Sequence, residues 1–214
     1  MTRLTKFTHS CVRLDDGDRH LVVDPGMFSE VQAALDGVSA VLITHEHPDH
    51  VDLDGVLEAG RRDPRLRIWA PAPVADSLAE LGEQVVTSAP GQAFEAGGFA
   101  VRTLGGQHAL IHPTIPVVPN VGYLIDDAVY HPGDSLIVPT DPVQLLLAPI
   151  HAPWSKTAEV IDFVVSVRAP RAVGIHNALL NDTGRGFVEG HVTRIGADHG
   201  VTYTALAAAE AIEV

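Results

Sequence analysis

Four side chains that can bind divalent metals stand within six residues, at His45, His47, Asp49 and His50. They follow a largely apolar run at residues 38–43. Imidazole and carboxylate groups are ligands of zinc and of harder divalent cations, so this cluster at a strand end indicates a metal site. Because residues two apart in extended chain share one side, His45 and His47 can face one metal.

The residues between these ligands support the same interpretation. Pro48 favours extended backbone at His47, which helps to hold the first pair in place. Asp49 and His50 fall where the chain turns into the following helix, and they can point at a second metal. Glu46 faces the opposite side and is not expected to be a ligand. The alternative, a solvated turn, does not account for four ligand-type residues in this register.

Three further segments end an apolar strand with a ligand-type residue. His108 follows two glycines that allow close approach of the backbone, Asp134 lies in a tight turn, and His176 ends residues 172–175. Each of the three alone is more typical of a hydrogen-bonded structural residue. Together with the first cluster they complete a set of seven, which favours one shared site.

The elements that must position this set follow from the apolar pattern. Short strands precede strand–helix alternation in each half of the chain, which predicts two stacked sheets flanked by helices in one domain, residues 1–214. Strands are expected at residues 3–8, 11–14, 20–24, 38–43, 66–69, 84–87, 100–104, 121–125, 128–131, 143–147 and 172–175. Helices are expected at residues 29–35, 52–62, 73–81, 157–167 and 186–197.

Composition limits the function classes. The chain has 14 basic and 27 acidic residues and a net charge of −13, which disfavours nucleic acid as a partner. No apolar run reaches the roughly 18 residues of a membrane span, and the N-terminal residues do not resemble a signal peptide. The single Cys11 excludes an internal disulfide and fits a reducing cytoplasm. We therefore expect a cytoplasmic protein with a small-molecule substrate, and self-association stays open.

The cluster resembles the H-x-H-x-D-H signature of the metallo-β-lactamase fold superfamily, matched by His45, His47, Asp49 and His50. The resemblance covers essentially the whole chain. It implies a four-layer αββα sandwich of two mixed β-sheets flanked by helices. Segments 6–11, 22–25 and 131–135 are similar to the group that includes L-ascorbate-6-phosphate lactonase and N-acyl-phosphatidylethanolamine-hydrolysing phospholipase D.

The resemblance also implies a division of the ligands. It assigns His45, His47 and His108 to one metal, Asp49, His50 and His176 to the other, and Asp134 to a bridging position. A hydroxide shared by two metals would then attack an ester, lactone or phosphodiester, with Asp49 orienting it. Zinc is favoured by the histidine content, and manganese or iron are the alternatives.

Departures from related groups narrow the choice. β-Lactamases proper place a cysteine at the second metal, whereas Cys11 lies in another segment. Diiron members replace the second histidine with glutamate, and His47 argues against them. Two alternatives remain: a non-catalytic metal-binding or scaffold protein that keeps the site, and a thioester hydrolase of glyoxalase II type, which normally carries an added helical domain.

Other candidate residues have two interpretations each. His9 could act in catalysis or be a hydrogen-bonded turn residue, and Asp24 could fix the tautomer of a metal-bound histidine or accept backbone N–H groups. His112, in a proline-rich segment after His108, could belong to a lid. His151 and Trp154 could contact substrate or simply pack in their loop.

Overall fold

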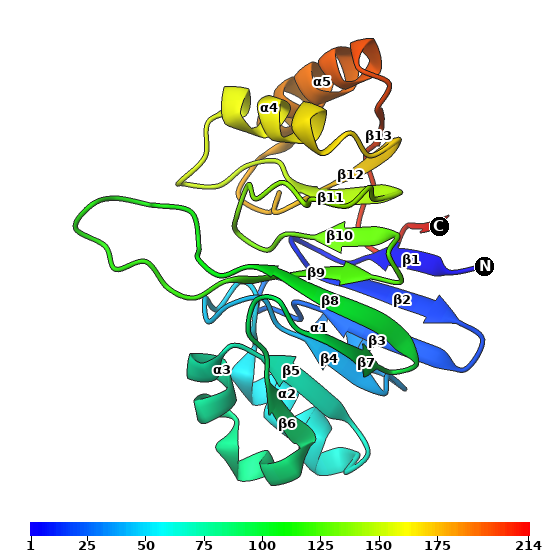
Figure 1. The fold of residues 1–214 in the computed structure, drawn as a ribbon, viewed down its shortest axis with the longest axis vertical. Coiled ribbons are helices and arrows are strands. Elements are labelled where there is room, and N and C mark those ends of the chain that lie inside the picture. The colour runs from blue at the N-terminus through cyan, green and yellow to red at the C-terminus, as the bar shows by residue number, and fades with distance from the viewer.

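The computed structural model describes residues 1–214 and places them in two facing seven-stranded sheets with helices on both outer sides (Figure 1). The first sheet has the order β14-β1-β2-β3-β4-β5-β6 and the second the order β13-β12-β11-β10-β9-β8-β7. The first comprises β1 (Arg3–Lys6), β2 (Val12–Asp16), β3 (Arg19–Val23), β4 (Ala40–Leu42), β5 (Arg67–Ala70), β6 (Val85–Thr87) and β14 (Ala211–Glu213). The second comprises β7 (Ala93–Ala96), β8 (Phe99–Gly105), β9 (Val121–Ile125), β10 (Val129–His131), β11 (Leu145–Pro149), β12 (Arg171–Ile175) and β13 (Thr202–Thr204).

Three apolar cores separate the layers. One core of 20 buried residues, including Leu42 and Tyr123, lies between the sheets. A second packs the first sheet against α1 (Val31–Ala34), α2 (Leu53–Arg62), α3 (Ala72–Ser77) and the 3-10 helix η1 (Ala79–Gln84). A third packs the second sheet against α4 (Thr157–Val167) and α5 (Asp182–Asp198). Both sheets contain parallel and antiparallel pairs, so the predicted αββα sandwich of mixed sheets is confirmed.

Local sequence explains the helix that follows the histidine-rich turn. Asp52 accepts a hydrogen bond from the Gly55 N–H at 3.2 Å and so caps the start of α2. Val56 and Ala59 share one buried face, which fixes the helix against the first sheet. The turn that carries the candidate ligands is therefore held at both ends, by β4 before it and by α2 after it.

The structure differs from the predicted elements at five places. The helix expected at residues 73–81 is divided into α3 and η1, because Leu78 leaves helical geometry at φ −100° and ψ 9°. α5 begins earlier than expected, since the Asn181 side chain accepts from the Gly184 N–H at 2.8 Å. The strands β7, β13 and β14 were not predicted. They are short edge strands of mixed polarity, whose pairing depends on neighbours distant in sequence.

Hydrogen bonds join the two sheets at one edge. The Val121 N–H donates to Thr44 O at 2.9 Å, and the Tyr123 hydroxyl donates to Ile43 O at 2.8 Å. His131 Nε2 lies 2.9 Å from Ser10 O, which ties the second sheet to the turn after β1. The strand ends that carry the candidate ligands meet at this edge. No helix in the structure has the length and apolar character to cross a membrane.

A charged side chain is buried beside this edge. Lys6 is only 2% exposed, and its Nζ donates to Phe7 O at 2.9 Å and to Asn177 Oδ1 at 3.4 Å. It forms no ion pair, so burial is poorly offset and lowers the pKa of Lys6 to about 8. The unfolded chain, with an ordinary lysine pKa of 10.5, binds more protons than the folded chain between these two values.

We expect the Lys6→Met variant to lose a pH dependence of stability that the parent chain has. Above the pKa of Lys6 in the unfolded chain, the lysine is neutral in both states and its burial costs least. As the pH falls through the lower pKa of Lys6 in the folded chain, this stability is lost, so the free energy of unfolding of the parent chain should rise with pH. The difference in free energy of unfolding between pH 7.5 and 9.5 should shrink by about 2 kcal/mol in the variant, measured by urea denaturation.

The second lysine of the chain offers a matched control, because Lys156 is 82% exposed. Lys156→Met should keep the parent profile over the same pH interval. If the free energy of unfolding of Lys6→Met changed with pH as it does in the parent chain, the lowered pKa assigned to Lys6 would be contradicted.

Candidate metal centre

The seven predicted ligands converge at the edge where the sheets are joined. They follow β4, β8, β10 and β12, and they fall into two groups whose potential ligand atoms lie within 4.8 Å of one another. One group contains His45, His47, His108 and Asp134, and the other contains His9, Asp49, His50 and His176. The grouping matches the division that the resemblance implies for six of the seven residues. It places Asp134, which that division has in a bridging position, in the first group only, and it adds His9 to the second. Their role as ligands stays a prediction.

Backbone carbonyls fix the tautomers of two of these histidines. His108 Nδ1 lies 2.6 Å from Ala109 O, and His176 Nδ1 lies 2.6 Å from His151 O. Because a carbonyl can only accept, each Nδ1 carries the proton and donates it. In the neutral rings, both Nε2 lone pairs therefore face the interior of the site and are available to a cation.

Asp24 performs the same task for a third histidine. Its Oδ2 lies 2.7 Å from His50 Nδ1 and accepts from the Thr44 hydroxyl, while its Oδ1 accepts from the Thr44 N–H, both at 2.8 Å. Since the Thr44 proton is used in this way, the threonine oxygen can accept from His45 Nδ1 at 3.0 Å. The structure thus combines both interpretations of Asp24, as a backbone acceptor and as a partner of a candidate ligand.

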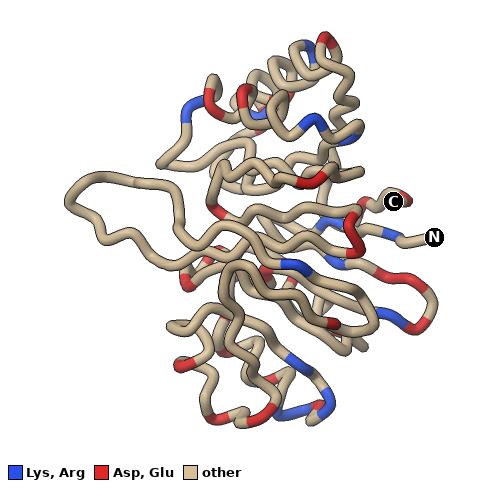
Figure 2. The backbone as a smooth tube through the Cα atoms, viewed as in Figure 1, with Lys and Arg blue, Asp and Glu red and all other residues tan.

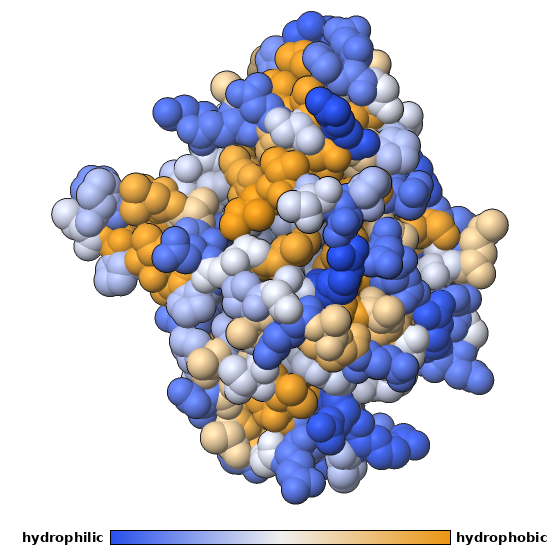
Figure 3. Space-filling model, in the orientation of Figure 1, coloured by the Kyte–Doolittle hydropathy of each residue, from blue (hydrophilic) through white to orange (hydrophobic).

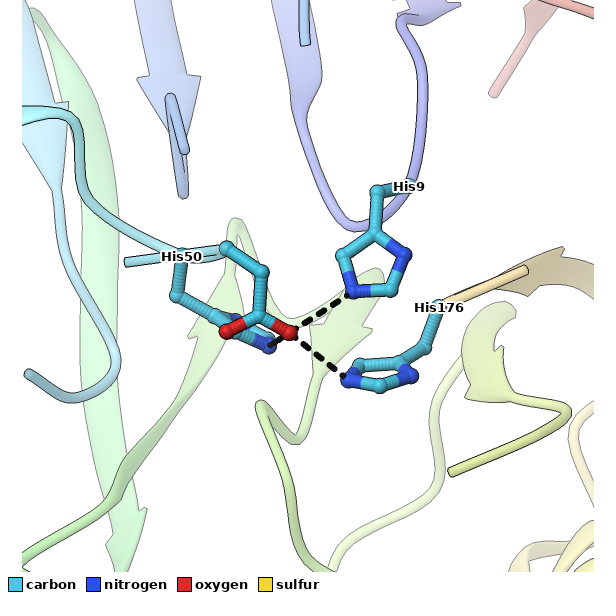
Figure 4. Close-up of side chains that lie close together, drawn as sticks. His9, His50 and His176 are labelled. Atoms are coloured by element: carbon cyan, nitrogen blue, oxygen red, sulfur yellow. Dashed lines mark hydrogen bonds and ion pairs between the residues drawn. The ribbon is translucent and has the colours of Figure 1, made fainter. Parts of the chain in front are cut away.

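His9 differs from the other histidines of the site. Its Nδ1 accepts from the Ala178 N–H at 3.2 Å, so the proton of the neutral ring lies on Nε2, which donates to Asp49 Oδ2 at 3.1 Å. Burial lowers the pKa of His9 to about 4, which keeps the ring neutral. In this state His9 holds the Asp49 carboxylate and offers no lone pair to a metal. Figure 4 shows His9, His50 and His176 directed toward one another.

Four buried atoms at the centre have no hydrogen-bond partner: Nε2 of His50, His108 and His176, and Oδ1 of Asp134. The three nitrogens lie 3.1–3.2 Å from Asp134 oxygens. Unpaired polar atoms in a buried site are costly, and cations bound among them would satisfy all four. The residues present therefore fit divalent cations.

Proton charge balances the carboxylates when no cation is bound. Burial opposes charge on His50 and His176, but the nearby Asp134 outweighs it, raising the pKa of His50 well above its usual value and that of His176 to about 9. Burial likewise opposes charge on Asp134, yet the two histidines hold the pKa of its carboxyl well below the usual range. A bound metal would replace these protons, so metal binding and proton release are coupled.

A cavity of about 550 Å³ opens onto the centre. Of the predicted substrate residues, Trp154 lines it and donates from Nε1 to Asp134 Oδ2 at 2.9 Å. His112 is exposed and contacts Thr114, and His151 contributes only its carbonyl to the site, so neither lines this cavity.

Sequence reasoning missed Met27, Phe28 and Leu179 in the cavity wall, whereas Ile111 belongs to the segment after His108 that was expected to form a lid. The sequence offered one indication of Met27 and Phe28, which are two apolar residues directly after the turn Asp24-Pro25-Gly26.

Asn120 was also missed, and it shapes the turn that carries Asp134. Its Oδ1 accepts from the Asp134 N–H at 3.0 Å, and its Nδ2 donates to Pro132 O at 2.9 Å. Gly133 has φ +61°, and a Cβ there would come within 2.3 Å of Asn120 Oδ1. A glycine is therefore required beside this amide, because the close approach and the left-handed backbone both exclude a side chain.

A family model described as the beta-lactamase superfamily domain matches residues 3–176. Protein Rv0786c of Mycobacterium tuberculosis is 38% identical over 198 residues, covering 90% of this chain and 92% of that protein. A UPF0173 metal-dependent hydrolase of Aeropyrum pernix is 27% identical over 152 residues, covering 63% of this chain and 62% of that protein.

Solved structures share the fold at lower identity. Igni18, a metallo hydrolase from Ignicoccus hospitalis, aligns over 99% of this chain and 97% of its own, with a TM-score of 0.76 and 18% identity. The metallo-beta-lactamase fold protein YhfI of Bacillus subtilis aligns over 99% of this chain and 98% of its own, with a TM-score of 0.76 and 17% identity.

We expect Asp24→Asn to weaken zinc binding by about 10- to 100-fold, because an amide has one acceptor oxygen for the donors that the carboxylate serves with two. Asparagine also tolerates the left-handed backbone of this position, φ 51°, so the fold should survive. The measurement is competition with a chromophoric chelator, with circular dichroism to verify folding.

Asp15→Asn is the matched control, since Asp15 Oδ1 lies 2.7 Å from His20 Nδ1 in a pair distant from the candidate ligands. It should leave zinc affinity unchanged. A folded Asp24→Asn variant with parent affinity would refute the role assigned to Asp24.

Proposed function

This chain belongs to the beta-lactamase superfamily, whose domain model matches residues 3–176, and we propose that it is a metal-dependent hydrolase of small molecules. The observation that carries the proposal is the set of buried imidazole nitrogens facing Asp134 without hydrogen-bond partners. Imidazole lone pairs that converge on one buried carboxylate are a donor set that bound cations would satisfy. The name metal-dependent hydrolase, borne by the Aeropyrum pernix relative, supports the same activity.

We assign the candidate ligands to two divalent cations. His45, His47 and His108 would hold one, Asp49, His50 and His176 the other, and Asp134 would contact both. When bound, the cations would polarise a carbonyl or phosphoryl oxygen and acidify the attacking water. The imidazole content favours zinc, with manganese and iron as alternatives.

The chain's own groups would position the reaction. Asp49 lines the cavity and its Oδ2 is held by His9, while Oδ1 makes no hydrogen bond within the chain. A carboxylate in this position can orient the attacking water through a hydrogen bond. We assign His9 as a positioning residue that acts through Asp49. Trp154 would restrain Asp134 through its indole N–H while its ring contacts substrate.

The bond cleaved would be an ester, lactone or phosphodiester of a small molecule. The cavity of about 550 Å³ lies within the usual range of small-ligand sites, roughly 300–1,000 Å³. A non-catalytic protein that retains the metals is the competing function, and turnover separates the two.

The test is metal analysis of protein purified without chelator, followed by zinc or manganese loading and a screen with p-nitrophenyl acetate, a γ-lactone and bis(p-nitrophenyl) phosphate. We expect about two metals per chain and turnover of at least one substrate. Fewer than one metal per chain under every condition would remove the basis of the proposal. Two metals without any turnover would favour the non-catalytic alternative.

We expect Asp134→Asn to lower turnover at least about 100-fold and to reduce metal content, because the amide cannot supply the same charge to two cations. Asp141→Asn, which changes a half-exposed carboxylate paired with Arg102, is the control and should keep both properties. An Asp134→Asn protein with two metals and full turnover would contradict the assignment.

A further inference from the structure

We propose that the substrate of this site carries an extended apolar group without charge, attached to the bond that is hydrolysed. The inference rests on the proposed hydrolase function and narrows its substrate class. It excludes phosphorylated and other multiply charged small molecules as preferred substrates.

The walls of the cavity carry the first argument. Apart from the candidate ligands, every residue that lines it is apolar or aromatic, including Met27, Phe28, Ile111, Trp154 and Leu179. Trp154 has the only polar side-chain atom among these, and that N–H is already bound to Asp134. No wall side chain is therefore available to a charged or hydrogen-bonding substituent.

The exposure of these walls carries the second argument. Met27 is 63% exposed, Phe28 47% and Leu179 51%, although each stands beside a buried polar centre. The Phe28 ring meets the His9 ring edge-on at 5.3 Å, which places the apolar surface directly against the site. An apolar group bound here would remove this surface from water, which is the main source of favourable binding energy for such contacts.

Charge carries the third argument. No lysine or arginine lines the cavity, and Lys156, two residues from Trp154, is 82% exposed and pairs with Glu159 at 3.6 Å. A phosphate remote from the scissile bond would need a cationic partner that the cavity does not supply. A charged group held there would lose hydration without compensation.

The segment between β8 and β9, residues 106–120, extends the apolar surface. It projects from the sheets (Figure 1), contains no charged residue (Figure 2) and displays hydrophobic side chains (Figure 3). Its base is held by the hydrogen bond from His108 N–H to Val118 O at 3.0 Å, and Ile111 reaches the cavity. Beyond the cavity, Leu110, Ile115 and Val117 are 44–56% exposed on the same segment.

A series of p-nitrophenyl esters on the metal-loaded protein tests the proposal. From butanoate to octanoate, kcat/KM should rise about two- to four-fold per methylene. The mono-p-nitrophenyl ester of adipic acid, which matches the hexanoate in carbon number but ends in a carboxylate, should be at least about ten-fold poorer than the hexanoate. A flat series, or a preference for the charged ester, would overturn the proposal.

Wall variants locate the effect. Phe28→Ala and Leu179→Ala should each lower kcat/KM for the octanoate about five- to twenty-fold and reduce the gain per methylene. Phe187→Ala is the matched control, because Phe187 is 69% exposed on α5 and does not line the cavity. Wall variants with the chain-length dependence of the parent would place the apolar group elsewhere and overturn the assignment.

A binding measurement separates this inference from the hydrolase function. In a Trp69→Phe background Trp154 is the only tryptophan, and its fluorescence can be titrated with octanamide and with the monoamide of suberic acid. Octanamide should bind at least about ten-fold more tightly than the charged analogue. Tighter binding of octanamide without any ester turnover would refute the proposed hydrolase function but not the apolar character of the ligand. Ester turnover with tighter binding of the charged analogue would refute the proposed apolar substrate but not the hydrolase function.

Discussion

The structure depends on a cluster of buried carboxylates and imidazole lone pairs that requires opposite charge to compensate it. Asp24 and Asp134 are almost completely buried within a ring of histidines, and Asp49 is held at the cavity. Removing a carboxylate from water is costly unless opposite charge and hydrogen bonds compensate for it. Protons on His50 and His176 supply that charge in the metal-free chain, and we propose that cations supply it in the active protein.

The charged groups can compensate one another because the two sheets meet at one edge. The candidate ligands come from both sheets, so a small slide of one sheet against the other would separate them. Main-chain and side-chain hydrogen bonds prevent this, including Val121 N–H to Thr44 O, Tyr123 hydroxyl to Ile43 O, and His176 N–H to His9 O. The interior core of 20 buried residues supplies the hydrophobic stabilisation, and these polar connections determine the register.

Sequence predicts the parts of the site that obey strand geometry. Ligand-type residues at the ends of apolar strands indicate His108, Asp134 and His176, because β8, β10 and β12 run in the same direction and their carboxyl ends meet at one edge of the sheet. The cavity wall follows no such rule, since Met27, Phe28 and Leu179 lie on loops whose packing is set by distant segments. The edge strands β7, β13 and β14 escaped prediction for a related reason, because their pairing partners are set by the tertiary fold.

Polar centre and cavity wall are thus constrained differently. Each candidate ligand at the centre except His47 is held by a group outside the ligand set: replacing Asp24, for example, would leave donors of Thr44 and His50 without their acceptor. Apart from Trp154, the wall residues are largely exposed and make no comparable hydrogen bonds, so one apolar side chain can replace another there at small cost in stability. It follows that chemistry and selectivity can change separately in this fold. Under the proposed function, the sheet ends would preserve the reaction, and the loops after β3, β8, β11 and β12 would decide which molecule reaches it.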